Sequence, residues 1–372
     1  MAKRQTMEAV DRTMQDITGE KLPFNGKKII MECDFRQTSS SVSSCYMITC
    51  YFSPMKISAL PVSLHLNLCS TFFRNDCKGS NCSGGECGVS KDRAKYKIIV
   101  IHGFDSSKDM KLPISQELIE ELQIYFLSFD RAGYGESDPH PKRSVKSEAF
   151  DVQELADKLQ IGSKFYIIGL SMGAYAVWSC LRYIPHRLSG VSLVVPFVDY
   201  WWPCLPSDLA KEVFELLLVQ DRWTFRVAHY APWLFHWWMN QKLFPSLSIM
   251  AGNMNIFCQP DLEFLKNLPP NPDDNTQEKT RQQGVYESLY RDIMAGYGKW
   301  EFDPMDITNP WPDNNGAAHI WQGFEDKIIP YKVNRFLSEK IPFIRYHEVK
   351  GKGHFLPFES GICEEIVRTL LA

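Results

Sequence analysis

The feature that most constrains the fold is a series of short apolar runs that alternate with helical patterns. The runs cover residues 95–103, 125–130, 164–169, 190–197, 318–323 and 343–349. They are apolar at almost every position, and a strand of this kind must be buried on both of its faces. Between them, the helical pattern at 144–161 places Ala149, Val152 and Leu155 on one side. The sequence therefore predicts an α/β fold with a mostly parallel sheet covered by helices.

Two parts of the chain break this alternation. Residues 1–90 are rich in Ser and Cys and show no sustained helix or strand period, so they are expected to form an atypical, poorly ordered N-terminal segment. Residues 198–313 hold eight of the ten tryptophans and several helical patterns, without a convincing core strand. An insertion of this size between two strands is expected to form a helical cap, or lid, over the strand ends. The α/β core then comprises residues 91–197 and 314–372.

Composition narrows the range of functions. The net charge of −3 predicts no basic face for nucleic acid, and the 44% hydrophobic content supports a large core. Because the chain opens without the apolar segment of a secretion signal, its eleven cysteines are expected to be reduced and the protein cytoplasmic. The apolar run at residues 57–73 contains Pro61, His65 and Asn67, so it is predicted not to span a membrane.

The spacing of Cys77, Cys82 and Cys87 raises the alternative of a metal site. Zinc sites usually draw their ligands from CxxC-like pairs, with a second pair later in the chain. No second pair is evident in the sequence. The cysteines are therefore interpreted as part of the N-terminal segment, and neither a metal nor another cofactor is predicted.

One serine lies between two glycines directly after a predicted strand. The stretch GLSMG (169–173) leads from the run at 164–169 into a helical pattern, which is the context of a nucleophile elbow. Glycines on both sides let strand and helix approach closely, so that a hydroxyl on a strained turn projects outward. The pattern predicts that Ser171 is a nucleophile, and an ordinary serine in a Gly-containing loop is the alternative.

A serine nucleophile needs a base, and the best placed of the nine histidines is His354. It lies in a glycine-rich turn just past the run at 343–349, which can aim the ring at the edge of the sheet. His347 lies inside that run, His319 begins another predicted strand and His186 follows a helix. None of these three has a comparable position.

The base in turn needs a carboxylate that fixes its tautomer and stabilises the imidazolium. Asp326, which follows the run at 318–323, is the preferred candidate. A turn or capping aspartate is the alternative interpretation of this residue. Asp199 competes because it follows the run at 190–197 at the same edge of the sheet, and Glu325 is a weaker rival.

Attack on a carbonyl creates an oxyanion that needs two preorganised N–H donors. One is expected to be the backbone N–H of Met172, at the start of the helix after the serine. The other is expected to be the backbone N–H of Phe104, in the loop after the first run, where Gly103 permits a close approach. The HGGG sequence that one carboxylesterase branch uses is not present.

Together these residues resemble the α/β-hydrolase superfamily. The segments GLSMGAYAVWSCLRYIPHRLSGVSLVVPFVDYWWP, DRAGYGESDP, GFEDKIIP and YHEVKGKGHF are similar to a plant group of lipase- or esterase-like members, from about residue 88 to the C-terminus. The resemblance implies an aromatic helical cap and a catalytic triad of Ser171, Asp326 and His354. Relatives usually carry a strand hairpin before the first predicted strand, and many have an N-terminal apolar anchor. Residues 1–87 resemble neither, so the sheet is expected to lack that hairpin.

The leading functional hypothesis is hydrolysis of a carboxylic ester or related acyl compound through an acyl-enzyme. A small apolar acyl or ester substrate is expected, because Trp237 and Trp238 lie in an aromatic segment that can roof the pocket over Ser171. The alternatives are a triad-bearing small-molecule receptor and an acyltransferase with little hydrolytic turnover. The resemblance implies membrane association as the alternative to a cytoplasmic location, and the oligomeric state is not encoded in any of these motifs.

Overall fold

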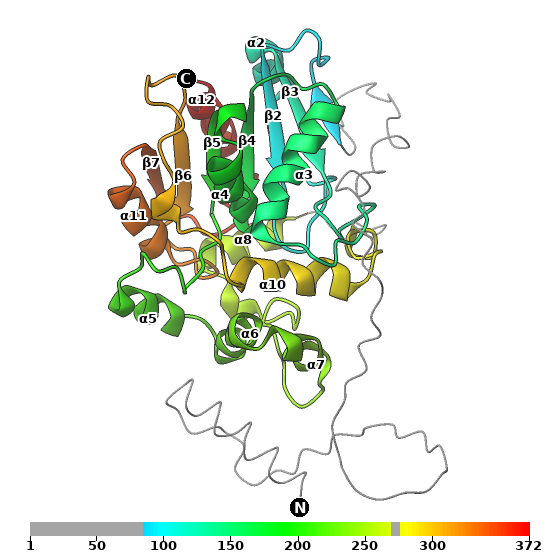
Figure 1. The fold of residues 1–372 in the computed structure, drawn as a ribbon, viewed down its shortest axis with the longest axis vertical. Helices are drawn as coiled ribbons and strands as arrows, with labels where there is room; N and C mark the ends of the chain where they lie inside the picture. Colours follow the sequence, from blue (N-terminus) through cyan, green and yellow to red (C-terminus); the bar gives the residue numbers. More distant parts are fainter. Residues whose placement is uncertain (1–84, 269–275) are drawn as a thin grey trace, which may run out of the picture. The chain divides into compact units, whose positions relative to one another are not determined.

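The structure, a computed structural model, describes residues 85–268 and 276–372. Each of the six apolar runs is a strand: β2 (Tyr96–Ile101), β3 (Ile124–Phe129), β4 (Phe165–Leu170), β5 (Leu188–Val194), β6 (Ala318–Gly323) and β7 (Ile344–Val349). They pair in parallel in the order β3-β2-β4-β5-β6-β7 (Figure 1). The predicted α/β fold with a mostly parallel sheet is therefore confirmed.

The sheet has a seventh strand, which the sequence analysis placed in the N-terminal segment. β1 (Glu86–Gly88) pairs antiparallel with β3 at the edge of the sheet. A strand of three residues is too short to show a period. The expectation of reduced cysteines is also corrected in part, because Cys87 is disulfide-bonded. Residues 1–84, including the run at 57–73 and the other cysteines of the metal alternative, lie outside the described residues.

Helices cover both faces of the sheet. α3 (Val145–Lys158) and α4 (Ala174–Tyr183) pack side by side on one face. On α3, Ala149, Val152 and Leu155 are buried, as the helical pattern predicted. α2 (Gln116–Leu122) and α12 (Ser360–Leu371) contribute to the apolar core on the other face. This core joins Ile119 of α2 to Val367 of α12 across the strands.

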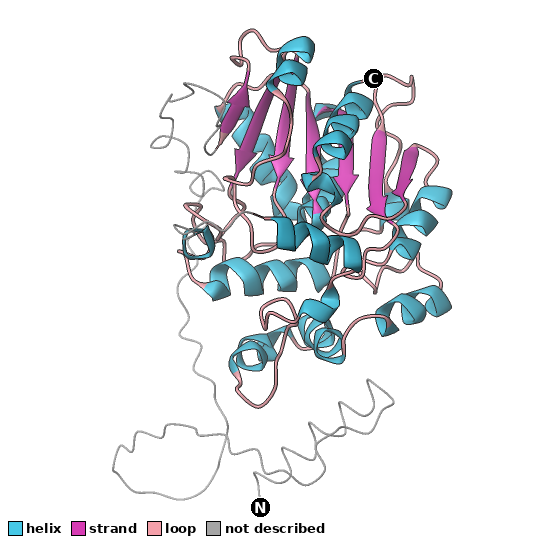
Figure 2. Ribbon diagram, turned by 180° about the vertical axis from the view of Figure 1, so that it is seen from behind, coloured by secondary structure: helices cyan, strands magenta, loops and turns pink. Residues whose placement is uncertain are grey.

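Residues 198–313, which we call the inserted segment, connect β5 to β6. Its helices are α5 (Ser207–Glu215), α6 (Val219–Tyr230), α7 (Phe235–Asn240), α8 (Gln259–Asn267), α9 (Thr276–Thr280) and α10 (Arg291–Tyr297). The part of this segment that the structure describes contains no strand. Figure 2 shows that the arrowheads of the parallel strands point toward these helices. The carboxyl ends of the strands therefore face the inserted segment.

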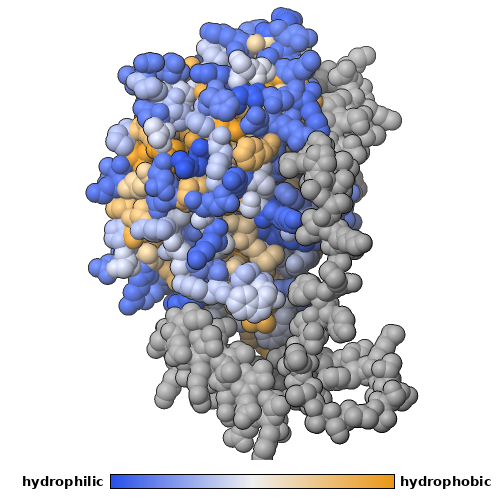
Figure 3. Space-filling view, in the orientation of Figure 1, coloured by the Kyte–Doolittle hydropathy of each residue, from blue (hydrophilic) through white to orange (hydrophobic). Residues whose placement is uncertain are grey.

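The surface mixes polar and apolar side chains. On the face shown in Figure 3, apolar side chains gather in patches among polar ones. Apart from Phe150, the exposed large apolar side chains of the described residues all belong to the inserted segment, and Trp233 is the most exposed of them. Across residues 85–268 and 276–372, none of the helices combines the length and the apolar character needed to cross a bilayer.

Candidate active site

Ser171 lies on a sharp turn between β4 and α4. A single 3-10 turn, η2 (Ser171–Gly173), joins the strand to the helix. The φ angle of Ser171 is +50°, a conformation that costs a non-glycine residue on the order of 1 kcal/mol. The Phe197 N–H, just past β5, donates a 3.0 Å hydrogen bond to the Ser171 carbonyl and holds this backbone in place.

Both glycines beside Ser171 are required by close packing. A Cβ on Gly169 would lie 2.3 Å from Cγ2 of Val177 on α4. A Cβ on Gly173 would lie 2.5 Å from the Ile101 carbonyl oxygen and 2.6 Å from that of His102. Any side chain at these positions would push α4 away from the strands. The glycines of the GLSMG stretch therefore have the steric role that the sequence analysis assigned to them.

The structure brings three predicted side chains together at the carboxyl ends of the strands. The Oγ of Ser171 lies 3.0 Å from Nε2 of His354. The other ring nitrogen of His354, Nδ1, lies 2.8 Å from Oδ2 of Asp326. Both distances are those of hydrogen bonds, and they form one continuous chain from carboxylate through imidazole to hydroxyl. With Nδ1–H donating to the carboxylate, Nε2 is free to accept the serine proton.

The carboxylate of Asp326 is itself held in place. Its Oδ1 accepts backbone N–H bonds from Ile328 at 2.9 Å and Ile329 at 3.0 Å. The Nε2 of Gln322, a buried residue of β6, donates to Oδ2 at 3.2 Å. The sequence analysis did not single out Gln322. A polar residue near the carboxyl end of a mainly apolar strand is the signal that could have identified it.

The pKa of His354 is set by opposing effects. Burial lowers it, whereas the charge of Asp326, the hydrogen bond to Asp326 and the charge of Asp261 raise it, and the net pKa lies above the usual value. Asp261 comes from α8 and supports the same turn, because its Oδ1 accepts the Phe355 N–H at 3.0 Å. The surroundings thus favour the imidazolium that forms when the ring accepts a proton.

The competing candidates lie elsewhere. Asp199 is buried and accepts the Trp201 N–H at 3.1 Å, and burial raises its pKa to about 8. Asp199 makes no hydrogen bond to His354, because both ring nitrogens of that residue have the partners described above. Glu325 is exposed. Of the other histidines, His347 stacks on Trp321 within the sheet.

The loop after β2, residues 102–105, approaches the serine closely. A Cβ on Gly103 would lie only 3.1 Å from the Ser171 Cβ. Phe104 in this loop and Met172 after the serine both line the cavity above Ser171. Within the described part of the chain, no group accepts a hydrogen bond from the Phe104 N–H. Both predicted backbone donors therefore belong to residues that line the cavity at Ser171.

A cavity of about 610 Å³ opens above Ser171. Its walls are mainly apolar and come from both the core and the inserted segment. They include Leu170, Met172, Val195 and Phe197 from the core and Leu217, Phe225, Leu247, Ile249, Ile293 and Tyr297 from the inserted segment. Trp237 and Trp238 are not among the described residues that line it. Trp238 is instead buried within the inserted segment, where its indole N–H donates to Thr224 Oγ1 at 2.8 Å.

Several solved structures are similar to this chain at low sequence identity. An esterase from Thermogutta terrifontis is 20% identical, with 77% of this chain and 91% of that chain covered and a TM-score of 0.46. An esterase from Exiguobacterium antarcticum is 19% identical, with 77% and 94% covered and a TM-score of 0.49. A protein from Mycobacterium tuberculosis is 14% identical, with 77% and 91% covered and a TM-score of 0.50. At these identities the likeness concerns the fold alone.

Among curated protein sequences, none matches this chain. The sequence profile of the alpha/beta hydrolase family matches residues 98–368, which include every strand except the short β1 and the start of β2, and also the inserted segment. This match covers well over half of the chain. The protein therefore belongs to the alpha/beta hydrolase family.

Proposed function

We propose that this protein is a serine hydrolase that cleaves carboxylic esters or related acyl compounds through an acyl-enzyme. The observation that carries the proposal is the hydrogen-bonded chain from Asp326 through His354 to Ser171, with the serine on a strained turn below an apolar cavity. Hydrolase activity agrees with membership of the family. The ester substrate and the roles of single residues are the new part of the proposal.

In the proposed mechanism, His354 Nε2 takes the proton of the Ser171 hydroxyl as Oγ attacks the carbonyl carbon of the ester. The negative oxygen that forms is stabilised by the backbone N–H groups of Phe104 and Met172. The imidazolium then gives its proton to the departing alkoxide, which leaves an acyl group on Oγ. Water, deprotonated by His354, attacks this acyl group, and the acid and free Ser171 are released.

Asp326 keeps its negative charge throughout. Its hydrogen bond to Nδ1 selects the tautomer in which Nε2 can accept a proton, and its charge stabilises the imidazolium. The raised pKa of His354 supports this role. Because Gln322 and two backbone N–H groups hold the carboxylate, Asp326 needs no rearrangement during the reaction.

We further propose that the inserted segment is a cap over the active site and that the substrate has an apolar acyl or alcohol group. Side chains of α6 and α10, including Phe225 and Ile293, form part of the apolar cavity wall. A charged metabolite or a sugar would leave its polar groups unpaired against such a wall. The residues that line the cavity replace Trp237 and Trp238 as the proposed contacts for this group.

A receptor or an acyltransferase with the same triad is the alternative function. Labelling with a fluorophosphonate probe, followed by turnover of p-nitrophenyl esters of increasing chain length, tests the proposal. Labelling at Ser171 together with turnover supports the hydrolase. Labelling or binding without turnover would favour the receptor, and acyl transfer to an added alcohol in preference to water would favour the transferase.

A further inference from the structure

We propose that the inserted segment positions the backbone N–H of Phe104 through two ion pairs, Arg131–Asp292 and Arg281–Asp105. The first pair bonds to Gly103, which precedes Phe104, and the second includes Asp105, which follows it. The inference rests on the proposed function, since it concerns the donor to the oxyanion. Arg131, Asp292 and Arg281 are positioning residues in this scheme, because they act through the loop at 102–105 and contact no reacting atom.

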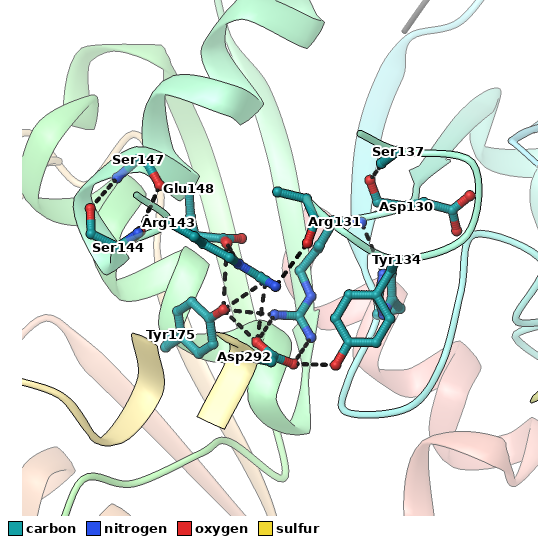
Figure 4. Close-up of polar contacts among 12 residues, drawn as sticks. Asp130, Arg131, Tyr134, Ser137, Arg143, Ser144, Ser147, Glu148, Tyr175 and Asp292 are labelled. Atoms are coloured by element: carbon teal, nitrogen blue, oxygen red, sulfur yellow. Dashed lines mark hydrogen bonds and ion pairs between the residues drawn. The ribbon is translucent and has the colours of Figure 1, made fainter. Parts of the chain in front are cut away.

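The first ion pair is buried and joins the core to α10. Arg131, just past β3, donates from both terminal nitrogens to Asp292, at 2.6 Å and 2.7 Å. Both side chains are fully buried. Figure 4 shows that Tyr134 and Tyr175 also point toward this carboxylate, and their hydroxyls donate to it at 2.6 Å and 2.5 Å. The carboxylate of Asp292 thus fixes the direction of the Arg131 guanidinium.

The guanidinium of Arg131 also bonds to the loop at 102–105. Its Nη2, which also bonds to Asp292, donates to the Gly103 carbonyl at 3.0 Å. His102 supplies a second donor, because its Nδ1 lies 2.8 Å from the same oxygen. The Nε2 of His102 accepts the Arg131 backbone N–H at 3.0 Å, which fixes the neutral tautomer with the proton on Nδ1. Burial, followed by the charge of Arg131, holds the pKa of His102 well below its usual value.

The peptide bond between Gly103 and Phe104 links the direction of the Gly103 carbonyl to that of the Phe104 N–H. The described residues contain no cis peptide bond, so the carbonyl of Gly103 and the N–H of Phe104 point in opposite directions. Two donors behind the peptide hold the carbonyl away from the cavity that Gly103 and Phe104 line. The N–H of Phe104 consequently faces the side on which Ser171 lies.

The second ion pair holds the other side of Phe104. Arg281, which follows α9 in the inserted segment, donates from Nε to Oδ1 of Asp105 at 2.7 Å and from Nη2 to Oδ2. Asp105 has a φ of +52°, a conformation that a non-glycine residue keeps only when its surroundings hold it. The hydrogen bond to Asp105 raises the pKa of Arg281. Contacts that originate in the inserted segment therefore constrain the chain on both sides of Phe104.

The test compares two arginines of the same segment. Arg281→Gln removes the charge that holds Asp105. Arg291→Gln is the matched control, because Arg291 binds Glu287 and the Pro141 carbonyl, and none of its hydrogen bonds within the described residues reaches the loop at 102–105. We expect Arg281→Gln to lower kcat for p-nitrophenyl esters about fivefold with little change in KM. Loss of a whole oxyanion donor costs about 100-fold or more, and a loosened donor costs less.

A second measurement separates positioning from general loosening. An alkyl trifluoromethyl ketone adds to Ser171 and places an oxyanion between the two N–H donors, whereas the matching methyl ketone reports binding without this adduct. Arg281→Gln should weaken the trifluoromethyl ketone by the same factor as kcat and leave the methyl ketone unchanged. Arg131→Lys should act in the same direction and more strongly, because a lysine cannot bridge Asp292 and Gly103 as the planar guanidinium does. If Arg131→Lys fails to fold, the Arg281→Gln result decides.

The outcomes distinguish this inference from the function on which it rests. A wild-type chain that neither turns over esters nor labels at Ser171 would contradict the proposed hydrolase. If the wild-type chain is active, equal kcat and equal trifluoromethyl ketone affinity in Arg281→Gln and Arg291→Gln would overturn the inference alone. A loss in Arg281→Gln that appears only in KM would also overturn it, since that result describes substrate binding.

Discussion

The Ser171 turn and the loop at 102–105 lie next to each other in the candidate active site, yet different parts of the chain hold them. The Ser171 turn depends on the core: Gly173 packs against the carbonyls that end β2, and Phe197 bonds to the Ser171 carbonyl. The loop at 102–105 depends on Asp292 and Arg281 of the inserted segment. The comparison teaches that the proposed nucleophile, Ser171, can be correctly placed while the proposed oxyanion donor, the Phe104 N–H, is not.

The largest expected effect falls on the core side of this comparison. Ser171→Ala removes the attacking oxygen, so ester turnover should fall by on the order of 10^4- to 10^6-fold. Initial rates with a short p-nitrophenyl ester measure this loss. The variant should unfold at the wild-type temperature or above it, because alanine replaces a serine in the strained turn without adding atoms. Retention of most of the activity would remove Ser171 from the mechanism.

The choice between Asp326 and Asp199 as the partner of His354 gives the next effect. Asp326→Asn should lower kcat by on the order of 10^4, because an amide at this position favours the wrong imidazole tautomer. Asp199→Asn should be mild, since Asp199 bonds to a backbone N–H and not to His354. Parallel kcat measurements on the two variants decide the question. The reverse order would assign the acid to the end of β5.

The close packing of Gly173 against the strands predicts that a larger residue at this position destabilises the fold. Gly173→Ala places a methyl group 2.5 Å from a backbone carbonyl oxygen, which cannot swing aside as the end of a side chain can, so the free energy of unfolding should fall by roughly 1–3 kcal/mol. Urea denaturation measures this change. Gly361→Ala is a suitable control, because a Cβ there meets nothing within 4 Å. Equal stabilities would show that α4 can shift without cost.

The pH dependence tests the electrostatics of the base. His354 must be neutral to accept the serine proton, and Asp326 raises its pKa, so kcat/KM should fall as the pH drops through a value above the ordinary pKa of histidine. In Asp326→Asn the residual activity should persist to lower pH, because the main influence that raises the His354 pKa is lost while burial still lowers it. An unchanged inflection would assign the titration to another group.

The smallest effect concerns the tryptophans of α7. Trp237→Ala should leave the preference for acyl chain length unchanged, because Trp237 is not on the described cavity wall. Phe225→Ala, on that wall, should shift the preference toward longer chains by several-fold, in line with the worth of a few methylene groups. Turnover across a series of ester chain lengths compares the two variants. A shift in Trp237→Ala alone would restore this tryptophan as a substrate contact.

Much of the fold and part of the candidate site could be predicted from the sequence, for physical reasons. Buried parallel strands are continuously apolar, so all six appeared as runs, and the carboxyl ends of such strands had to meet at one edge. Ser171 directly follows β4, Asp326 lies three residues past the end of β6, and His354 lies five residues past the end of β7. β1 was missed because three residues carry no period. The Arg131–Asp292 pair joins residues 161 positions apart, and no local pattern encodes such a contact.

The position at which residues 198–313 leave the sheet has a consequence for how members of this family diversify. β5 and β6 are parallel neighbours, with Val191 opposite Ala318, so the insertion begins at the carboxyl end of β5 and ends at the amino end of β6, on the opposite edge of the sheet. Near its end, the indole N–H of Trp311 donates to the carbonyl of Leu188, the first residue of β5. A connection between parallel strands must cross the sheet in this way, which takes about a dozen residues or more. Length beyond that crossover costs mainly the entropy of closing a loop, which grows by only about 0.6 kcal/mol for each doubling. Segments of different length can therefore be exchanged here, provided that each keeps the return across the sheet.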